Sequence, residues 1–315
     1  MTGDPLSVVF MGTPDFAIPT LQALIDNDRF NLKAVVTQPD RPKGRGKKLA
    51  IPPVKKLALD NEIAVFQPEK VREQETVDAI KSLEPDYLVV VAYGQILPLP
   101  LLAIPKLAPV NLHASLLPKY RGAAPIHRAF VDGETITGVC AMMMEEGLDT
   151  GDLLACKKTE ITNDDTVGRL HDRLAAIGAA LMVESLIDYS EGSITPRKQD
   201  GALATYAKKL DKSEFKIDWG QTSDQVSRRI RGLSPFPGAA TTFKNETVKP
   251  LFAKALSGNS DDAPGVIQSI TRKGVVVSCG EGSVLITEIK PEGKRAMEAH
   301  AFTLGRSAQV GDTFV

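Results

Sequence analysis

The sequence predicts an α/β fold with a mostly parallel, Rossmann-like sheet, followed by a smaller all-β domain. Strand-like and helix-like segments alternate from residue 6 to residue 189, as in a parallel sheet covered by helices. The continuous apolar run Tyr87–Ala92 suits a central strand that is buried on both faces. Beyond residue 212, short strand-like segments recur between Gly and Asn clusters, which is typical of a small barrel or sandwich.

The alternating pattern gives the elements of the first domain. We expect strands at Leu6–Phe10, Leu32–Thr37, Ile63–Phe66, Tyr87–Ala92, Val110–His113 and Gly138–Met144, and helices at Ala17–Ile25, Pro53–Asn61, Glu75–Leu83 and Thr166–Tyr189. The last helix keeps Leu170, Leu174 and Leu181 near one face, and Gly192 ends it. Ligands of such sheets bind beyond the carboxyl ends of strands, where Asn111 and His113 lie.

The pattern changes after the long helix. Residues 195–212 are polar, charged or small and read as a linker, so we expect one domain at 1–194 and another at 213–315. The expected elements of the second domain are a helix at Ser223–Arg231 and strands at Ala240–Phe243, Leu251–Leu256, Gly265–Ile270, Gly274–Cys279 and Val284–Ile289.

Composition is that of an ordinary globular protein. The 315 residues are 43% hydrophobic and 24% charged, which suits one large or two modest domains. No apolar run approaches the ~18 residues of a membrane span, and the N-terminus lacks a signal pattern, so we expect no membrane partner. The net charge of -1 hides an excess of Lys and Arg over Asp and Glu in residues 206–315, a weak sign of a polyanionic partner.

Cysteine and histidine spacing argues against metal binding. Cys140, Cys156 and Cys279 are widely spaced and form no C-x-x-C pair, which predicts neither a disulfide framework nor a zinc site and suits a reducing cytoplasm. The four histidines also lack metal-ligand spacing, so no metal is expected.

Three residues could together carry acyl transfer. Asn111 and His113 stand two residues apart in N-L-H-A-S-L-L-P-K-Y-R-G-A-A-P, so in a strand they project to the same side. Asp149 lies in the glycine-flanked segment G-L-D-T-G-D, free to approach the imidazole. An oxyanion donor, a base and an orienting carboxylate suit transfer of an acyl group to an amine or to water. Taken singly, each residue also fits a structural role in a turn or a core.

These segments resemble the catalytic core of the 10-formyltetrahydrofolate-dependent formyltransferases. The N-terminal F-M-G-T-P-D-F-A, the basic loop Q-P-D-R-P-K-G-R-G-K-K and the later R-I-R-G-L-S-P-F-P-G-A narrow the resemblance to the members that act on methionyl-tRNA. The resemblance implies that the second domain is an OB-like β-barrel that binds tRNA. It also implies catalytic roles for Asn111, His113 and Asp149.

Further binding residues follow from the same resemblance. The family's folate-binding motif is matched by Ser115, Leu116, Leu117 and Pro118. Its backbone hydrogen bonds and apolar walls would hold the folate. The alternative interpretation of these four residues is a structural turn that ends at a proline. The tRNA acceptor end would meet the basic loop, whose cationic residues are Arg41, Lys43, Arg45, Lys47 and Lys48. By its composition alone that loop is a mobile, solvated segment. Phe16 either lines a methionyl pocket or packs the first helix, and Arg121 is structural or faces an anion.

The implied activity is transfer of a formyl group from 10-formyltetrahydrofolate to the α-amine of methionyl initiator tRNA. The expected partners are this tRNA and the folate co-substrate, with a monomeric, cytoplasmic protein. Formylation of a sugar nucleotide or of glycinamide ribonucleotide, and hydrolysis of the folate, are alternatives that would not need the basic loop. A non-catalytic RNA-binding module is a further alternative. The presence of Asn111, His113 and Asp149 argues against it, because binding alone does not need these three residues.

Overall fold

The computed structural model describes residues 4–43, 48–258 and 261–315. Contacts divide the chain into two compact units. The first comprises Met1–Gly122, Thr137–Thr159 and His171–Tyr206, and the second comprises Ala123–Ile136, Glu160–Leu170 and Ala207–Val315. The second unit therefore includes two segments that precede the predicted linker, in addition to the C-terminal residues.

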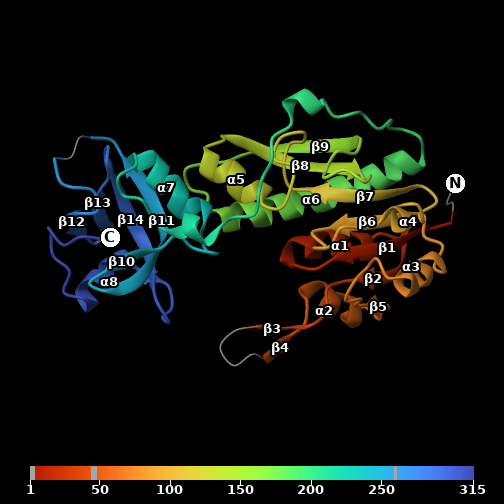
Figure 1. The fold of residues 1–315 in the computed structure, drawn as a ribbon, viewed down its shortest axis with the longest axis horizontal. Coiled ribbons are helices and arrows are strands. Elements are labelled where there is room, and N and C mark those ends of the chain that lie inside the picture. The colour runs from red at the N-terminus through yellow and green to blue at the C-terminus, as the bar shows by residue number, and fades with distance from the viewer. Residues whose placement is uncertain (1–3, 44–47, 259–260) are drawn as a thin grey trace. The chain divides into compact units, whose positions relative to one another are not determined.

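The first unit is built on a mostly parallel sheet, as the sequence predicts. Its strand order is β5-β2-β1-β6-β7-β8-β9 (Figure 1). The strand bounds are β1 Leu6–Gly12, β2 Phe30–Val36, β5 Val65–Phe66, β6 Tyr87–Val91, β7 Ala108–His113, β8 Ile136–Met143 and β9 Leu153–Glu160. The neighbouring strands from β5 to β7 pair in parallel, whereas β7 and β8 are antiparallel. The fully buried β6 lies between β1 and β7, which confirms the central strand expected at Tyr87–Ala92.

The helices beside this sheet are α1 Ile18–Ile25, α2 Pro53–Asp60, α3 Gln74–Lys81, α4 Leu99–Leu102 and α6 Val167–Ser190, with 3-10 turns at Asp15–Ala17 and Gly201–Leu203. Four of these helices, α1, α2, α3 and α6, lie at the expected places, and α4 was not predicted. Leu170, Leu174 and Leu181 of α6 are buried, which confirms the apolar face predicted for the long helix. No helix in the described part of the chain is both long and apolar enough to cross a membrane.

The structure corrects the prediction for the cysteines. Cys140 on β8 and Cys156 on β9 form a disulfide, with their Cα atoms 4.1 Å apart. The prediction of no disulfide was wrong for this pair, because it considered spacing along the chain and did not predict β9. As neighbours in the sheet, β8 and β9 bring the two residues together across 16 positions of sequence. Cys279 is buried and free.

The basic loop has more order than its composition predicts. β3 Arg41–Lys43 and β4 Lys48–Ala50 form an antiparallel pair in which Arg41 is opposite Ala50. Asp40, just before β3, accepts hydrogen bonds from Lys55 at 2.8 Å and from Gln67 at 2.7 Å. The Lys55 bond, and then the Gln67 bond, hold the pKa of the Asp40 carboxyl below its ordinary value. These polar contacts anchor a hairpin that has no apolar face of its own.

The second unit contains an antiparallel sheet of order β10-β11-β14-β13-β12, with β15 paired to β14. The strands are β10 Thr241–Phe243, β11 Glu246–Leu256, β12 Ile267–Thr271, β13 Gly274–Ser278, β14 Ser283–Pro291 and β15 Met297–Glu298. The C-terminal segment bridges both edges, since Phe314 pairs with Phe243 and Thr313 pairs with Val266. The two edge strands are thereby linked into the barrel-like closure that the resemblance implied.

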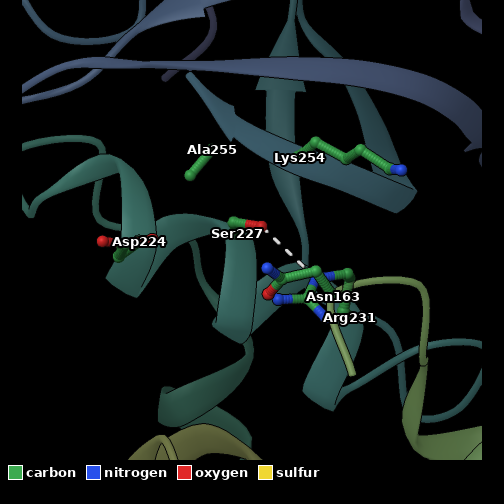
Figure 2. A pocket seen from close by; sticks show the side chains of 6 residues that line it. All are labelled: Asn163, Asp224, Ser227, Arg231, Lys254 and Ala255. Carbon is green, nitrogen blue, oxygen red and sulfur yellow. Dashed lines mark hydrogen bonds between the residues drawn. The ribbon is translucent and has the colours of Figure 1, made fainter. Parts of the chain in front are cut away.

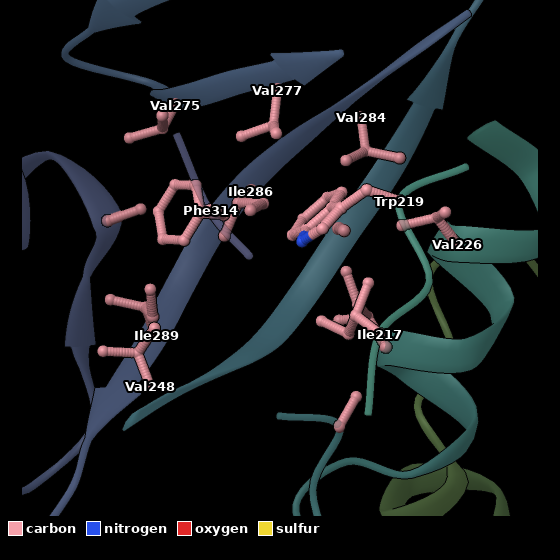
Figure 3. Packing of buried hydrophobic residues seen from close by; sticks show 14 of the residues in the cluster. Ile217, Trp219, Val226, Val248, Val275, Val277, Val284, Ile286, Ile289 and Phe314 are labelled. Atoms are coloured by element: carbon pink, nitrogen blue, oxygen red, sulfur yellow. The ribbon is translucent and has the colours of Figure 1, made fainter. Parts of the chain in front are cut away.

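Aliphatic side chains and a few aromatic rings, among them Trp219 and Phe314, form the core of this unit (Figure 3). Phe314 packs against Trp219 and Phe243, with ring centroids 5.9 and 4.8 Å apart, and Phe243 also contacts Phe302. All four residues are buried, and the Trp219 indole N–H donates to the Thr241 hydroxyl at 3.0 Å. The helices of the unit are α5 Pro125–Asp132, α7 Ser223–Gly232 and α8 Ala299–Gly305, with a 3-10 turn at Lys212–Phe215.

Candidate active site

Asn111 and His113 lie at the carboxyl end of β7, where the sequence places them. Asn111 is opposite Val90 on β6 and Met142 on β8, and His113 is opposite Cys140 on β8. Alternation along the strand turns both side chains to the same face of the sheet. The half-buried Asn111 amide makes no hydrogen bond with any described residue. It is therefore a donor that remains available to a substrate.

The hydrogen bonds of His113 distinguish its two ring nitrogens. The residue is 5% exposed, and its Nε2 lies 2.9 Å from the Tyr120 carbonyl oxygen. A carbonyl can only accept, so this contact assigns a hydrogen to Nε2. In the neutral ring the lone pair is then on Nδ1, which lies 3.6 Å from Oδ2 of Asp149. Nδ1 is therefore the nitrogen that can take up a proton.

Asp149 reaches this position on a constrained loop between β8 and β9. Its backbone has φ +52°, in the left-handed region that non-glycine residues seldom adopt. Its Oδ2 accepts the Gly122 backbone N–H at 2.7 Å. Gly151 is required nearby, because a Cβ there would lie 1.9 Å from the Met143 carbonyl oxygen. The structure thus brings His113 and Asp149 together and fixes the carboxylate with a backbone donor.

Sequence reasoning missed the residue that supports this loop. The Gln199 side chain donates to the carbonyl oxygens of Asp149 and Gly151, at 2.9 and 2.7 Å. Its own oxygen accepts from Arg121, whose role the sequence left open and which is 6% exposed. Gln199 lies in the segment that reads as a linker, where composition gives no signal for a residue of the site.

In the expected folate-binding motif, most side chains contact other parts of the protein. The Ser115 hydroxyl donates to the Lys119 carbonyl at 2.6 Å, and the Leu116 side chain packs so closely on Gly138 that a Cβ there would clash. The Leu117 side chain joins a small apolar cluster with Cys140 and Met142. The backbone N–H and C=O of Leu117 make no hydrogen bond with a described residue, and Pro118 is half-buried. The N–H and C=O of Leu117 are therefore peptide groups that a ligand could bind.

The expected tRNA-binding residues are only partly described. The Arg41 side chain is exposed, and Lys43 and Lys48 face each other in the β3–β4 pair, although their side chains are not described. Arg45 and Lys47 lie outside the described residues. Phe16 is 6% exposed, and its ring lies edge-on to His171 with centroids 5.2 Å apart. Phe16 thus packs the first helix segment against α6, and its role in substrate binding stays a prediction.

A cavity of about 280 Å³ lies in the second unit (Figure 2), and none of the residues that line it is a predicted site residue. Its lining includes Arg231 of α7, which is 5% exposed and donates to the carbonyls of Thr162 and Asp165 and to the Ser227 hydroxyl. Burial lowers the pKa of the Arg231 guanidinium from its ordinary value. Lys254, also at the rim, pairs with Asp164 at 2.6 Å. The cations of this cavity are therefore engaged in holding the segment 160–170, which belongs to the same unit.

Metal chemistry has no support in the described ranges. Among residues 4–43, 48–258 and 261–315, no three His, Cys, Asp or Glu side chains are grouped so that they could hold a metal ion. The His113 and Asp149 pair is accompanied instead by the Asn111 amide and by backbone groups.

Comparison with known proteins yields one family over both units. Residues 6–186 match the formyl transferase family model, and residues 209–307 match the model of the formyl transferase C-terminal domain. A methionyl-tRNA formyltransferase of Clostridium novyi (strain NT) is 45% identical over 306 residues, covering 97% of this chain and 98% of the relative. Another, from Pelobacter propionicus, is 48% identical over 299 residues, covering 95% and 93%.

Solved structures share the fold at lower identity. HypX from Aquifex aeolicus, in complex with tetrahydrofolic acid, has a TM-score of 0.66 and 16% identity. The match covers 98% of this chain, which spans about half the length of HypX. WlaRD, a sugar 3N-formyl transferase in the presence of dTDP and 5-N-formyl-THF, has a TM-score of 0.66 and 19% identity, covering 93% of this chain and 100% of that protein. At these identities the likeness concerns the fold alone.

Proposed function

We propose a reaction from one premise: this chain belongs to the formyl transferase family. The reaction is transfer of the formyl group of 10-formyltetrahydrofolate to the α-amino group of methionyl initiator tRNA. The observation that carries the proposal is identity of 45% or more, over nearly the whole length, to methionyl-tRNA formyltransferases. The group formed by Asn111, His113 and Asp149 supports it chemically.

Asn111 would stabilise the charge that develops during attack. When the amine nitrogen bonds to the formyl carbon, the carbonyl oxygen becomes an oxyanion that needs hydrogen-bond donors. The Asn111 amide has no hydrogen-bond partner among the described residues, so its N–H groups need not break an existing bond to serve. One donor of this kind typically contributes about 10²–10³ in rate.

His113 would accept the proton that the amine loses. Its Nε2 is occupied by the Tyr120 carbonyl, which leaves Nδ1 as the base. A proton on Nδ1 faces the Asp149 carboxylate, whose negative charge stabilises the imidazolium. As the bond between the formyl carbon and N10 of the folate breaks, N10 takes a proton. The proton released by the amine is thereby returned, and the reaction needs no other co-reactant.

The turn after His113 fits the folate donor. The donor supplies the formyl group, and the free N–H and C=O of Leu117 are the peptide groups that would bind its polar ring atoms. The side chains of Ser115, Leu116 and Pro118 would act mainly by shaping this turn, since they are engaged with the protein or partly covered.

The β3–β4 hairpin would bind the acceptor end of the tRNA. It presents the exposed Arg41, and Lys43, Arg45, Lys47 and Lys48 follow within the same segment. Cationic side chains bind phosphates with strong salt dependence, and unpaired RNA ends are the usual targets of specific recognition. A monomeric state, a cytoplasmic location and the role of Phe16 remain predictions, and the disulfide removes the argument for a reducing compartment that rested on cysteine spacing.

The test supplies one donor to several acceptors. Purified protein receives 10-formyltetrahydrofolate with methionyl initiator tRNA, with an amino-sugar nucleotide, with glycinamide ribonucleotide, or with water alone. The proposal requires formylation of the methionyl-tRNA at a rate far above the other acceptors. Preference for another acceptor would assign the chain to a different branch of the family, and tRNA binding without folate binding would favour the non-catalytic alternative.

A further inference from the structure

We propose that Gln199 is a positioning residue that holds the Asp149 loop in the conformation that presents the carboxylate to His113. This inference rests on the proposed function, in which Asp149 stabilises the protonated imidazole. Gln199 reaches the loop from a segment 50 residues further along the chain. Two observations assign this role: Gln199 hydrogen-bonds to the Asp149 loop, and Asp149 has a left-handed backbone that these bonds hold.

Both amide hydrogens of Gln199 are used on one short stretch of loop. Nε2 lies 2.9 Å from the Asp149 carbonyl oxygen and 2.7 Å from the Gly151 carbonyl oxygen. Together the two bonds fix the Asp149–Thr150 and Gly151–Asp152 peptide planes. Asp149 adopts φ +52°, a left-handed conformation that non-glycine residues keep only where surrounding contacts hold it. The amide is therefore placed to maintain an unfavourable but functional loop conformation.

Arg121 determines which way this amide faces. Its Nε and Nη2 donate to Oε1 of Gln199 at 3.2 and 2.8 Å. Because a guanidinium only donates, the oxygen of the amide must point to Arg121 and the NH₂ group to the loop. Glutamate in place of Gln199 would keep the bond to Arg121 but would set a carboxylate against two carbonyl oxygens. Asparagine would be shorter by one methylene.

The contacts close a ring around Asp149. Gly122, the next residue after Arg121, donates its N–H to the Asp149 carboxylate at 2.7 Å. Asp149 is thus held at its carbonyl by Gln199 and at its side chain by Gly122. The side-chain hydrogen bonds of Gln199 are to Arg121 and to backbone carbonyls, so it acts on the reaction through Asp149. Because Gly122 donates to this carboxylate, exchange of the Gly122 amide hydrogen shows whether the carboxylate is in place.

A matched control exists in the same unit. Gln95 is also half-buried, accepts the Val71 backbone N–H at 2.9 Å, and donates to the carbonyls of Pro68 and Glu69. Gln95→Leu therefore removes a glutamine with the same bonding pattern, away from Asp149 in sequence and bonded to different segments. We expect Gln95→Leu and Gln199→Leu to lower the thermal unfolding midpoint by similar amounts, and Gln95→Leu to leave kcat unchanged.

The experiment compares wild type, Gln199→Leu, Gln199→Glu, Asp149→Asn and the double variant Gln199→Leu/Asp149→Asn in the full chain. We measure kcat and KM for formyl transfer, and the exchange rate of the Gly122 amide hydrogen by NMR. We expect Gln199→Leu and Gln199→Glu to lower kcat by about 10²-fold, because small displacements of catalytic groups cost this much. KM should change less than about threefold. The Gly122 amide should exchange at least about tenfold faster.

Two outcomes overturn the proposal. One is an unchanged Gly122 exchange rate in a folded Gln199 variant. The other is a double variant whose loss of kcat equals the product of the losses of Gln199→Leu and Asp149→Asn, because residues that act as a unit do not show independent effects. If the leucine variant fails to fold, Gln199→Asn replaces it with the polar groups retained. If wild type itself does not formylate methionyl-tRNA, the proposed function fails, and Gly122 exchange still tests the role of Gln199.

Discussion

Oδ2 of Asp149 lies 3.6 Å from Nδ1 of His113, which is longer than a hydrogen bond, while it accepts the Gly122 N–H at 2.7 Å. The carboxylate is therefore fixed by the backbone and not by the imidazole. Among the described residues, no donor is hydrogen-bonded to Nδ1, so its lone pair can take up a proton, and the negative charge of Asp149 lies close by to stabilise the product of that transfer.

Asp149→Asn should lower kcat strongly. The amide keeps the size of the side chain and removes the charge, so a proton on His113 Nδ1 is no longer stabilised. We expect a loss of about 10²-fold or more in kcat, the usual contribution of a proton-transfer group. Steady-state kinetics with wild type as reference measures this. A variant with at least half the wild-type kcat would show that the charge of Asp149 is not used.

The cysteines predict a definite thiol count. Burial raises the pKa of the Cys279 thiol to about 12, and Cys140 is bonded to Cys156. Without reductant, the folded protein should show no reactive thiol and the denatured protein one, and reduction should expose all three. A thiol-reactive dye under the three conditions gives the count. Two or more thiols in the unreduced, denatured protein would contradict the disulfide.

Removing the disulfide should weaken the first unit. Cys156→Ser opens a loop closed across 16 residues, and the chain-entropy model gives a loss of about 3 kcal/mol in the free energy of unfolding. Urea denaturation compares the variant with wild type in the absence of reductant. Equal midpoints for the two proteins would indicate that the bond adds no stability.

The second unit should lose stability in acid. Arg128 donates to both carboxylate oxygens of Glu214, and this bond, followed by that from the Asp211 N–H, lowers the pKa of Glu214 below its ordinary 4.5. A lowered folded-state pKa gives stability that is present above 4.5 and lost as the pH falls through the folded value. We expect Glu214→Gln to lower the free energy of unfolding by about 1–2 kcal/mol at pH 7. The variant should also lose less stability than wild type as the pH falls below 4.5. Urea midpoints from pH 7 to pH 3 test this, and parallel curves for variant and wild type would contradict it.

Arg41→Ala should weaken tRNA binding without changing folate binding. Losing one phosphate contact reduces the slope of log affinity against log salt by about 1. Arg29→Ala is the matched control, since Arg29 is likewise exposed and pairs with Glu191. Binding of methionyl initiator tRNA is measured over a range of salt concentrations. Identical slopes for the two variants would exclude Arg41 from phosphate binding.

Sequence patterns predicted most of the parallel sheet, because buried strands such as β6 are continuous apolar runs. They missed β9, whose second half is exposed and charged at the edge of the sheet, and with it the partner of Cys140. Asn111 and His113 were predictable, since they lie two residues apart on one strand. Gln199 was not, because it contacts Asp149 across 50 residues and has the local composition of a linker.

Formyl transfer by wild type and His113→Ala, measured side by side, tests the central claim most directly. The assay follows transfer from 10-formyltetrahydrofolate to methionyl initiator tRNA, with folate binding as the check that the variant is folded. Loss of the base should reduce kcat by about 10²–10⁴-fold while folate still binds. Transfer by His113→Ala at the wild-type rate would contradict the assignment of this imidazole as the base, and with it the proposed mechanism.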